Sequence, residues 1–370
     1  MPKSVEKSIW DIAVLEAEKK NASESKDEGG ETKGSENHIL FIGSKNAGKT
    51  SIILRFLEKE EAPKPTIALE YTFGRRAKGH NMSIQNRVKD ICHIWELGGG
   101  TFLSQLTEIP LTEDTIMSSS VMVVMDLSQP YELWHTMETL IKSALDRVEQ
   151  VISKAARNDP SIQDRIKERA WKRIGVDHPD RDMLDPFPLP LVIIGTKYDV
   201  YQDFDPEKRK VISKTLRFIA HNYGAALQFS SNKTDGLMSR TKNLVSHLAF
   251  STTLSLKTIS VDPNKPISVP FGLDSLEQIG LPPVGDDDLG RSNARTPLDL
   301  WKQAFTSYFP QKSTIKAIVE DPSKDPQYAE AAVDNMREQK NKELERYRKQ
   351  AERRAKENKT GGSGDGILRL

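Results

Sequence analysis

Residues 38–50 of this 370-residue chain read HILFIGSKNAGKT, and this stretch decides the fold. The apolar residues 39–42 predict a short buried strand, and the pattern G-x4-G-K-T that follows is typical of a loop whose backbone amides bind phosphate oxygens. We expect Lys49 to neutralise phosphate charge and the hydroxyl of Thr50 to bind Mg²⁺. A helix predicted over residues 50–60 would direct its N-terminal amides at the same anion. The loop therefore forms a candidate nucleotide site made of Gly43, Ser44, Lys45, Asn46, Ala47, Gly48, Lys49 and Thr50.

Strands and helices alternate along the chain after this loop. The segments at residues 119–127 and 189–196 are continuously apolar, which indicates strands that are covered on both faces. The alternation predicts a doubly wound α/β sheet of the phosphate-loop class, with ligand bound at the carboxyl ends of its strands. Further strands are expected at residues 67–75, 88–97 and 226–230, and helices at residues 130–157, 206–223 and 233–250. About sixty residues separate two of the strands, so we expect a helical insertion at about residues 128–189.

Composition divides the chain into four regions. Residues 1–37 predict a short amphipathic helix and a flexible linker, and residues 38–250 form the phosphate-loop domain. Residues 251–325 are rich in proline, and we expect an extended arm there rather than a second sheet. An amphipathic helix within this arm is expected at residues 297–309. Residues 326–370 predict a long charged helix and a disordered tail.

The helix of the arm carries a cluster of large apolar side chains. One short helix on a proline-rich connection buries little apolar surface, so we expect much of residues 257–370 to be mobile in the free protein. Aromatic side chains often dominate protein interfaces, which makes this cluster a candidate partner-binding surface. Its members are Leu300, Trp301, Phe305, Tyr308 and Phe309. The charged helix has a thin apolar stripe, which favours contact with another chain, with a solvated helix as the alternative.

The overall charge and the cysteine content exclude several classes of protein. Net charge is +1 although 29% of residues are charged, so bulk electrostatics indicate neither nucleic acid nor membrane as a partner. The sequence has no apolar run long enough to span a bilayer. A single cysteine, Cys92, excludes an internal disulfide and suits the reducing cytosol. The seven histidines lack metal-ligand spacing.

Two stretches near the ends of predicted strands have the residues of a base-binding site. Asp199 could accept two hydrogen bonds from a guanine edge, and Lys197 could lie over the base. The stretch at residues 196–199, TKYD, resembles the guanine-specificity motif of small GTPases, with Thr196 in place of the usual asparagine. The second stretch is similar to their last base-binding loop and consists of Ser231, Asn232 and Lys233.

Two further stretches resemble the switches of small GTPases. Thr66 stands where the first switch closes over Mg²⁺, so Thr50, Thr66 and Glu96 form a candidate magnesium site. Glu96 replaces the usual aspartate, which adds a methylene where magnesium geometry is demanding. Gly100 replaces the glutamine that orients the attacking water. We therefore expect slow or absent hydrolysis, and a fold kept as a scaffold whose pocket is empty or permanently occupied.

Longer runs resemble one particular family, the dynein light intermediate chains, and among them the cytoplasmic dynein 2 members. The runs are KPTIALEYTFGR (64–75), WELGGGT (95–101), DPFPLPL (185–191), FDPEKRK (204–210) and DPQYAE (325–330). The resemblance implies an accessory subunit whose GTPase-like domain binds the motor heavy chain's tail. For the dynein 2 members it further implies other dynein 2 subunits and the intraflagellar transport machinery as partners. It places these members in the cytoplasm, on the cytoskeleton, and in the cilium and basal body. Their implied functions are retrograde transport and cilium assembly.

Two functions are consistent with these observations. The first is a noncatalytic motor subunit with no required cofactor, which the replacements at Glu96 and Gly100 favour. The alternative is a slow switch that binds GTP or GDP with Mg²⁺, for which the sequence retains Lys49, Thr50, Thr66 and Asp199.

Overall fold

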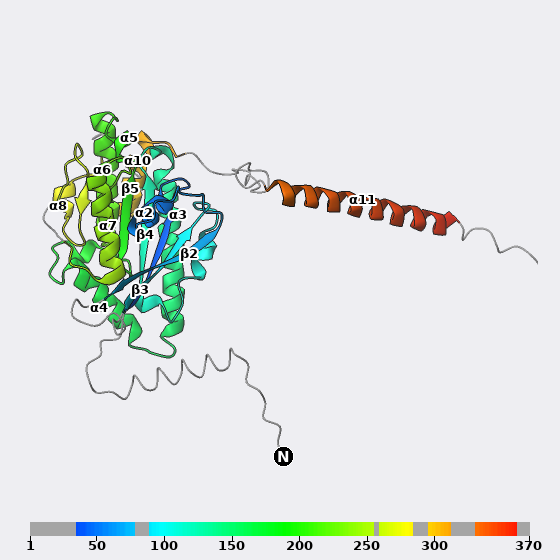
Figure 1. The fold of residues 1–370 in the computed structure, drawn as a ribbon. Coiled ribbons are helices and arrows are strands. Elements are labelled where there is room, and N and C mark those ends of the chain that lie inside the picture. Colours follow the sequence, from blue (N-terminus) through cyan, green and yellow to red (C-terminus); the bar gives the residue numbers. More distant parts are fainter. Residues whose placement is uncertain (1–34, 78–88, 255–258, 284–294, 312–329, 361–370) are drawn as a thin grey trace, which may run out of the picture. The chain divides into compact units, whose positions relative to one another are not determined.

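A seven-stranded sheet, in the order β2-β3-β1-β4-β5-β6-β7, organises the first part of the computed structural model (Figure 1). The structure describes residues 35–77, 89–254, 259–283, 295–311 and 330–360. The chain divides into two units, residues 1–312 and 313–370, and each is described by itself. The predicted N-terminal helix, most of the linker after it and the predicted tail beyond residue 360 lie outside the described residues.

The inner strands of the sheet are parallel, whereas both edge strands run antiparallel to their neighbours. The strands are β1 (Glu36–Gly43), β2 (Leu69–Ala77), β3 (Lys89–Leu97), β4 (Ser119–Asp126), β5 (Leu191–Thr196), β6 (Ala226–Phe229) and β7 (Ser268–Val269). The first six lie where the sequence predicts strands, within two or three residues at each end. The doubly wound α/β fold is therefore confirmed.

Helices follow most of the strands. They are α2 (Lys49–Phe56), α3 (Pro130–Ala155), α4 (Ile162–Ile174), α5 (Tyr198–Tyr201), α6 (Pro206–Asn222), α7 (Asp235–Phe250), α8 (Leu276–Ile279) and α10 (Pro297–Tyr308), with 3-10 turns at Ser104–Glu108, Ile116–Ser118 and Arg181–Met183. A proline opens α3, α6 and α10, where its fixed φ favours the helix and its missing N–H leaves no bond unmade. The helical insertion expected between β4 and β5 consists of α3 and α4.

Apolar side chains cover both faces of the sheet. Along β4, Val121 and Val123 face one apolar core while Met122 and Val124 face another. Helices α3 and α6 contribute to the first core, and α2 and α7 to the second. Trp134 of α3 is buried in the first core. The continuous apolarity of the strand is explained, because each side chain of β4 meets a layer of helices.

The proline-rich region after α7 is packed rather than extended. Strand β7 pairs antiparallel with β6 and adds a seventh strand to the sheet. Beyond it, the carboxylate of Asp274 forms a buried bidentate pair with the guanidinium of Arg217 in α6, with N–O distances of 2.8 and 2.5 Å. The expectation of an extended arm is therefore wrong for residues 259–283. The first unit also runs past the expected boundary at residue 250.

Helix α10 is packed on the first core through its aromatic side chains. Thr296 and Asp299 form a reciprocal capping box that fixes its start. The ring of Trp301 stacks on Phe218 at 4.6 Å between centroids, and Phe305 lies 5.9 Å from Trp134. Exposed fractions are 3% for Trp301, 0% for Phe305 and 1% for Phe309, with Leu300 half-buried and Tyr308 47% exposed. The predicted partner-binding cluster is therefore wrong for its three buried rings, because α3 and α6 already bury them.

The second unit contains one described helix, α11 (Ala331–Thr360). It lies where the sequence predicts the charged helix. Side chains of the predicted apolar stripe are exposed within this unit, with values of 58% for Val333, 56% for Met336 and 69% for Tyr347. None of the described helices combines the length and apolar character needed to cross a bilayer.

Candidate functional site

The phosphate-type loop joins β1 to α2 through residues with unusual backbone geometry. Asn46 and Gly48 have positive φ angles of 58° and 87°. A Cβ on Gly43 would lie 1.9 Å from the carbonyl oxygen of Val124, so only glycine allows β4 to pass this close. The amide of Ser44 donates to the same carbonyl over 3.1 Å. The loop is thus anchored to the neighbouring strand at the point where an anion would meet the start of α2.

Lys49 lies inside the loop rather than extended away from it. Its Nζ donates to the carbonyl oxygens of Ser44 at 3.0 Å and Gly43 at 3.5 Å, and the side chain is buried. Burial lowers the pKa of Lys49, and the nearby Glu96 opposes that shift. A bound phosphate would offer a stronger acceptor than these carbonyls. The other loop side chains are exposed at Lys45 and Asn46 and buried at Ala47.

The three residues of the candidate magnesium site lie together. The hydroxyl of Thr50 donates to Oε1 of Glu96 over 2.8 Å, and that of Thr66 donates to Oε2 of Glu70 over 3.0 Å. Burial raises the pKa of Glu96, while hydrogen bonds from Thr50 and Thr66 and the charge of Lys49 oppose the shift. These hydroxyl and carboxylate oxygens fit the ligand preference of Mg²⁺. Sequence reasoning missed Glu70, although a carboxylate four residues after Thr66 was a signal for it.

A run of three glycines after β3 packs against the loop and against the Thr66 stretch. A Cβ on Gly98 would lie 2.2 Å from the carbonyl oxygen of Thr66, so this approach also requires glycine. Gly100 has a φ of 63°, and its Cβ position would lie 3.5 Å from the amide nitrogen of Lys45. Gly100 thus stands beside the loop, where it offers no side chain to orient a water molecule.

The candidate base-binding residues meet at the carboxyl ends of β5 and β6, but their polar groups already have protein partners. Asp199 accepts a hydrogen bond from the hydroxyl of Ser231 over 2.7 Å and pairs with Nζ of Lys233 at 2.7 Å. Lys233 and then Ser231 lower the pKa of Asp199. Lys197, in the left-handed conformation, pairs with Asp126 at the end of β4. A guanine base would have to compete with Ser231 for one carboxylate oxygen and with Lys233 for the other.

Thr196 and Asn232 are two further residues of the predicted base site, and they lie in different surroundings. The hydroxyl of Thr196 donates to the carbonyl oxygen of Met125 over 2.9 Å, so this buried side chain connects β5 to β4. Asn232 is exposed, and its Nδ2 lies 4.0 Å from the Cβ position of Gly48. The structure therefore brings Asn232 to the loop and engages Thr196 within the sheet. Sequence reasoning missed Asp126, although an acidic residue ending a buried strand was a signal for it.

Comparison with known proteins identifies the family. The model of the Ras of Complex, Roc, domain of DAPkinase matches residues 38–154, which include the loop, the switch-like stretches and α3. Cytoplasmic dynein 2 light intermediate chain 1 of Bos taurus is 52% identical over 344 residues, covering 92% of this chain and 95% of that protein. The chain belongs to the dynein light intermediate chain family.

Other members of the dynein light intermediate chain family extend this similarity. Cytoplasmic dynein 2 light intermediate chain 1 of Danio rerio is 47% identical over 354 residues, covering 95% of this chain and 97% of that one. A solved structure titled "Crystal Structure of the Dynein Light Intermediate Chain's Conserved Domain" aligns with a TM-score of 0.48 and 16% identity, covering 76% of this chain and 93% of that one. The identities to the Bos taurus and Danio rerio proteins confirm the family predicted from the five runs of sequence.

Proposed function

We propose that the chain is a noncatalytic accessory subunit of the cytoplasmic dynein 2 motor. In this role it binds the tail of the heavy chain, joins the other dynein 2 subunits and supports retrograde intraflagellar transport and cilium assembly. It acts in the cytoplasm and the cilium, at the basal body and on the cytoskeleton. The observation that carries the proposal is 52% identity over 344 residues to a protein named cytoplasmic dynein 2 light intermediate chain 1.

The geometry of the candidate nucleotide site supports a noncatalytic role. Gly100 stands beside the loop without a side chain, and Lys233 occupies an oxygen of Asp199. Hydrolysis of GTP requires a positioned water and a stabilised transition state. The glutamine that usually positions the water is replaced by Gly100. The fold then acts as a scaffold, and no cofactor is required for assembly.

A slow GTP-binding switch is the second candidate function. It is favoured by the convergence of the loop, the Thr50, Thr66 and Glu96 oxygens, and Asp199 at the carboxyl ends of the strands. In this case the loop would hold the phosphates of GTP or GDP. The three oxygen ligands would hold Mg²⁺, which would supply charge neutralisation at the phosphates.

Copurification of the full chain with the tail of the dynein 2 heavy chain tests the first function. We expect a stable complex with this tail and none with the tail of the dynein 1 heavy chain under the same conditions. Failure to bind the dynein 2 tail would contradict the proposed subunit role.

Nucleotide content and turnover separate the two functions. The purified chain is denatured, any released nucleotide is identified by chromatography, and single-turnover hydrolysis of GTP is measured. We expect a rate well below about 10⁻² s⁻¹, the intrinsic rate of a GTPase that carries its own catalytic arginine. A faster rate would favour the switch.

A further inference from the structure

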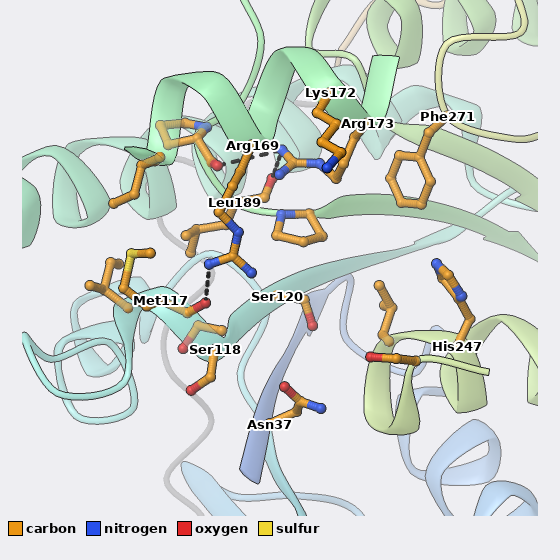
Figure 2. Close-up of a pocket in the computed structure, with 17 residues that line it drawn as sticks. Asn37, Met117, Ser118, Ser120, Arg169, Lys172, Arg173, Leu189, His247 and Phe271 are labelled. Atoms are coloured by element: carbon orange, nitrogen blue, oxygen red, sulfur yellow. Dashed lines mark hydrogen bonds between the residues drawn. The ribbon is translucent and has the colours of Figure 1, made fainter. Parts of the chain in front are cut away.

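A pocket lies at the amino ends of the parallel strands, opposite the carboxyl ends where the phosphate-type loop lies. It has a volume of about 480 Å³, within the size range of ligand sites. Asn37, Ser120 and Leu189 line it near the amino ends of β1, β4 and β5, and helices α4 and α7 contribute its other walls (Figure 2). The pocket shares no residue with the candidate nucleotide site.

Three basic side chains of α4 line one side of this pocket. Arg169, Lys172 and Arg173 are spaced three and four residues apart, so they lie on one face of the helix (Figure 2). The described residues that line the pocket include no aspartate or glutamate. In the described part of the chain, no carboxylate forms an ion pair with any of the three. The described residues that line the pocket therefore leave its positive charge without a neutralising carboxylate.

The two arginines bind backbone carbonyls and thereby shape the wall. Nη1 of Arg169 donates to Met117 over 2.8 Å, and Nη2 of Arg173 donates to Phe187 at 3.0 Å and to Leu189 at 2.9 Å. The segment around Leu189 contains prolines at positions 188 and 190, which have no N–H to donate. Arg173 thus supplies hydrogen bonds that hold this segment in place before β5.

Arg173 keeps an uncompensated charge in this position. Burial lowers the pKa of Arg173 to about 10, and the charge of Arg169 contributes to the shift. Its Nε is buried and has no hydrogen-bond partner among the described residues. Arg173 is half-buried, and its guanidinium has carbonyl acceptors but no carboxylate partner among the described residues, so a carboxylate brought into the pocket would be stabilised there.

The rest of the pocket is largely apolar or uncharged. Ile166 lies one helical turn before Arg169, and Leu189, Leu248 and Phe271 line the same space. A small inorganic anion would satisfy the charge and leave these apolar side chains without contact. A peptide with both acidic and apolar side chains would contact both kinds of wall.

We propose that this pocket binds an acidic segment of a partner protein, in which aspartate or glutamate side chains alternate with aliphatic or aromatic ones. The carboxylates lie against the three basic side chains of α4, and the apolar side chains lie against Leu189, Leu248 and Phe271. The pocket is separate from the candidate nucleotide site, since it lies at the amino ends of the parallel strands and the phosphate-type loop lies at their carboxyl ends.

Selection from a peptide library tests the proposal on the full chain. The probe is a library of capped heptapeptides with every position randomised, and bound peptides are sequenced. We expect the selected peptides to carry two or more acidic residues next to apolar ones. Selected peptides without acidic enrichment would overturn the proposal, as would a failure of the library to yield binders.

Matched variants locate the binding to the pocket. With the best selected peptide, Arg169→Ala combined with Lys172→Ala should weaken binding at least about tenfold, and rising salt should weaken it further. The control combines Arg157→Ala with Lys167→Ala, which removes one arginine and one lysine that are exposed, lie in the same insertion and do not line the pocket. Lys172→Glu alone provides a second test, because the side chain is exposed and its loss removes no core volume. Equal binding by the pocket variants and the control would overturn the proposal.

The chain itself is the competing source of acidic residues. Glu24, Asp27, Glu28 and Glu31 precede β1, whose Asn37 lines the pocket. Changing these four residues to their amides in the full chain should leave the affinity for the selected peptide unchanged. If the affinity rises about tenfold or more, the pocket is the site of an internal segment and the partner proposal is wrong.

Discussion

The phosphate-type loop and the region of residues 259–311 belong to one unit but are held in place differently. Lys49 binds carbonyls five and six residues before it. In the later region, Asp274 pairs with a residue 57 positions away, and Lys302 pairs with Glu138 across 164 positions at 2.8 Å. The loop also contacts β4, through the amide of Ser44 and the carbonyl of Val124, but its residues can be recognised from a short local pattern. The partners of Asp274 and Lys302 leave no such pattern, so composition alone does not reveal them.

Removing an aromatic ring from α10 should have the largest effect on stability. Trp301→Ala is expected to lower the free energy of unfolding by about 3–5 kcal/mol. The ring is buried and stacks on Phe218, so its removal leaves a cavity. Urea unfolding of the full chain, followed by circular dichroism, measures the change. A loss of this size would place α10 within the cooperative core of the domain.

Tyr308 of the same helix is the matched control. Its ring is 47% exposed, so Tyr308→Ala should cost about 0.5 kcal/mol or less. If both substitutions have equally small effects, α10 does not contribute to the stability of the domain, and the helix is detachable in the free protein.

Breaking the buried pair between Arg217 and Asp274 should have the next largest effect. The side chains are 6% and 4% exposed, so Asp274→Ala leaves an uncompensated charge and should cost roughly 3 kcal/mol. The control is Asp235→Ala, since its pair with Arg55 has side chains that are 91% and 59% exposed. That exposed pair should contribute at most about 1 kcal/mol. Similar losses in both variants would contradict a special role for distant contacts in this region.

Replacing Glu96, beside the loop, should have a smaller effect on the free energy of unfolding, and this effect should depend on pH. Burial raises the pKa of Glu96 above its ordinary value of 4.5, so folding favours the protonated carboxyl and stability falls as pH rises above that value. Glu96→Gln removes this dependence. In EDTA and without nucleotide, we therefore expect the variant to gain stability relative to the wild type as pH rises above 4.5, the ordinary pKa of a glutamate. An unchanged difference between the two unfolding curves would contradict the burial of the charge.

The smallest effect is expected for Lys49→Ala on motor assembly. Lys49 binds two carbonyls of its own loop, so its loss should leave the distant contacts of residues 259–311 intact. Copurification with the heavy-chain tail should equal that of the wild type, while any retained nucleotide is lost. A folded variant that no longer binds the tail would make nucleotide part of the assembly mechanism.

Much of the fold could be predicted because its signals are local. The continuously apolar β4 and β5 and the prolines opening α3 and α6 carry their own structural information. The grouping of Thr50, Thr66 and Glu96 followed from the resemblance of two stretches to the switches of small GTPases. The burial of Trp301 could not be read from its helix, because amphipathic helices look alike whether their partner is the same chain or another one. Likewise, Thr196 could be placed at a strand end, but the orientation of its hydroxyl depends on the backbone of β4.

Strand β7 also affects how the molecule meets copies of itself. The edge of a sheet exposes backbone N–H and C=O groups to which another strand can add. Here Leu227 and Gln228 of β6 are already paired with β7, which has only two residues and is flanked by Pro266 and Pro270. A strand this short, with prolines at both ends, is a poor template for further pairing. The region that the sequence suggested was a loose arm thus protects one edge of the sheet against aggregation.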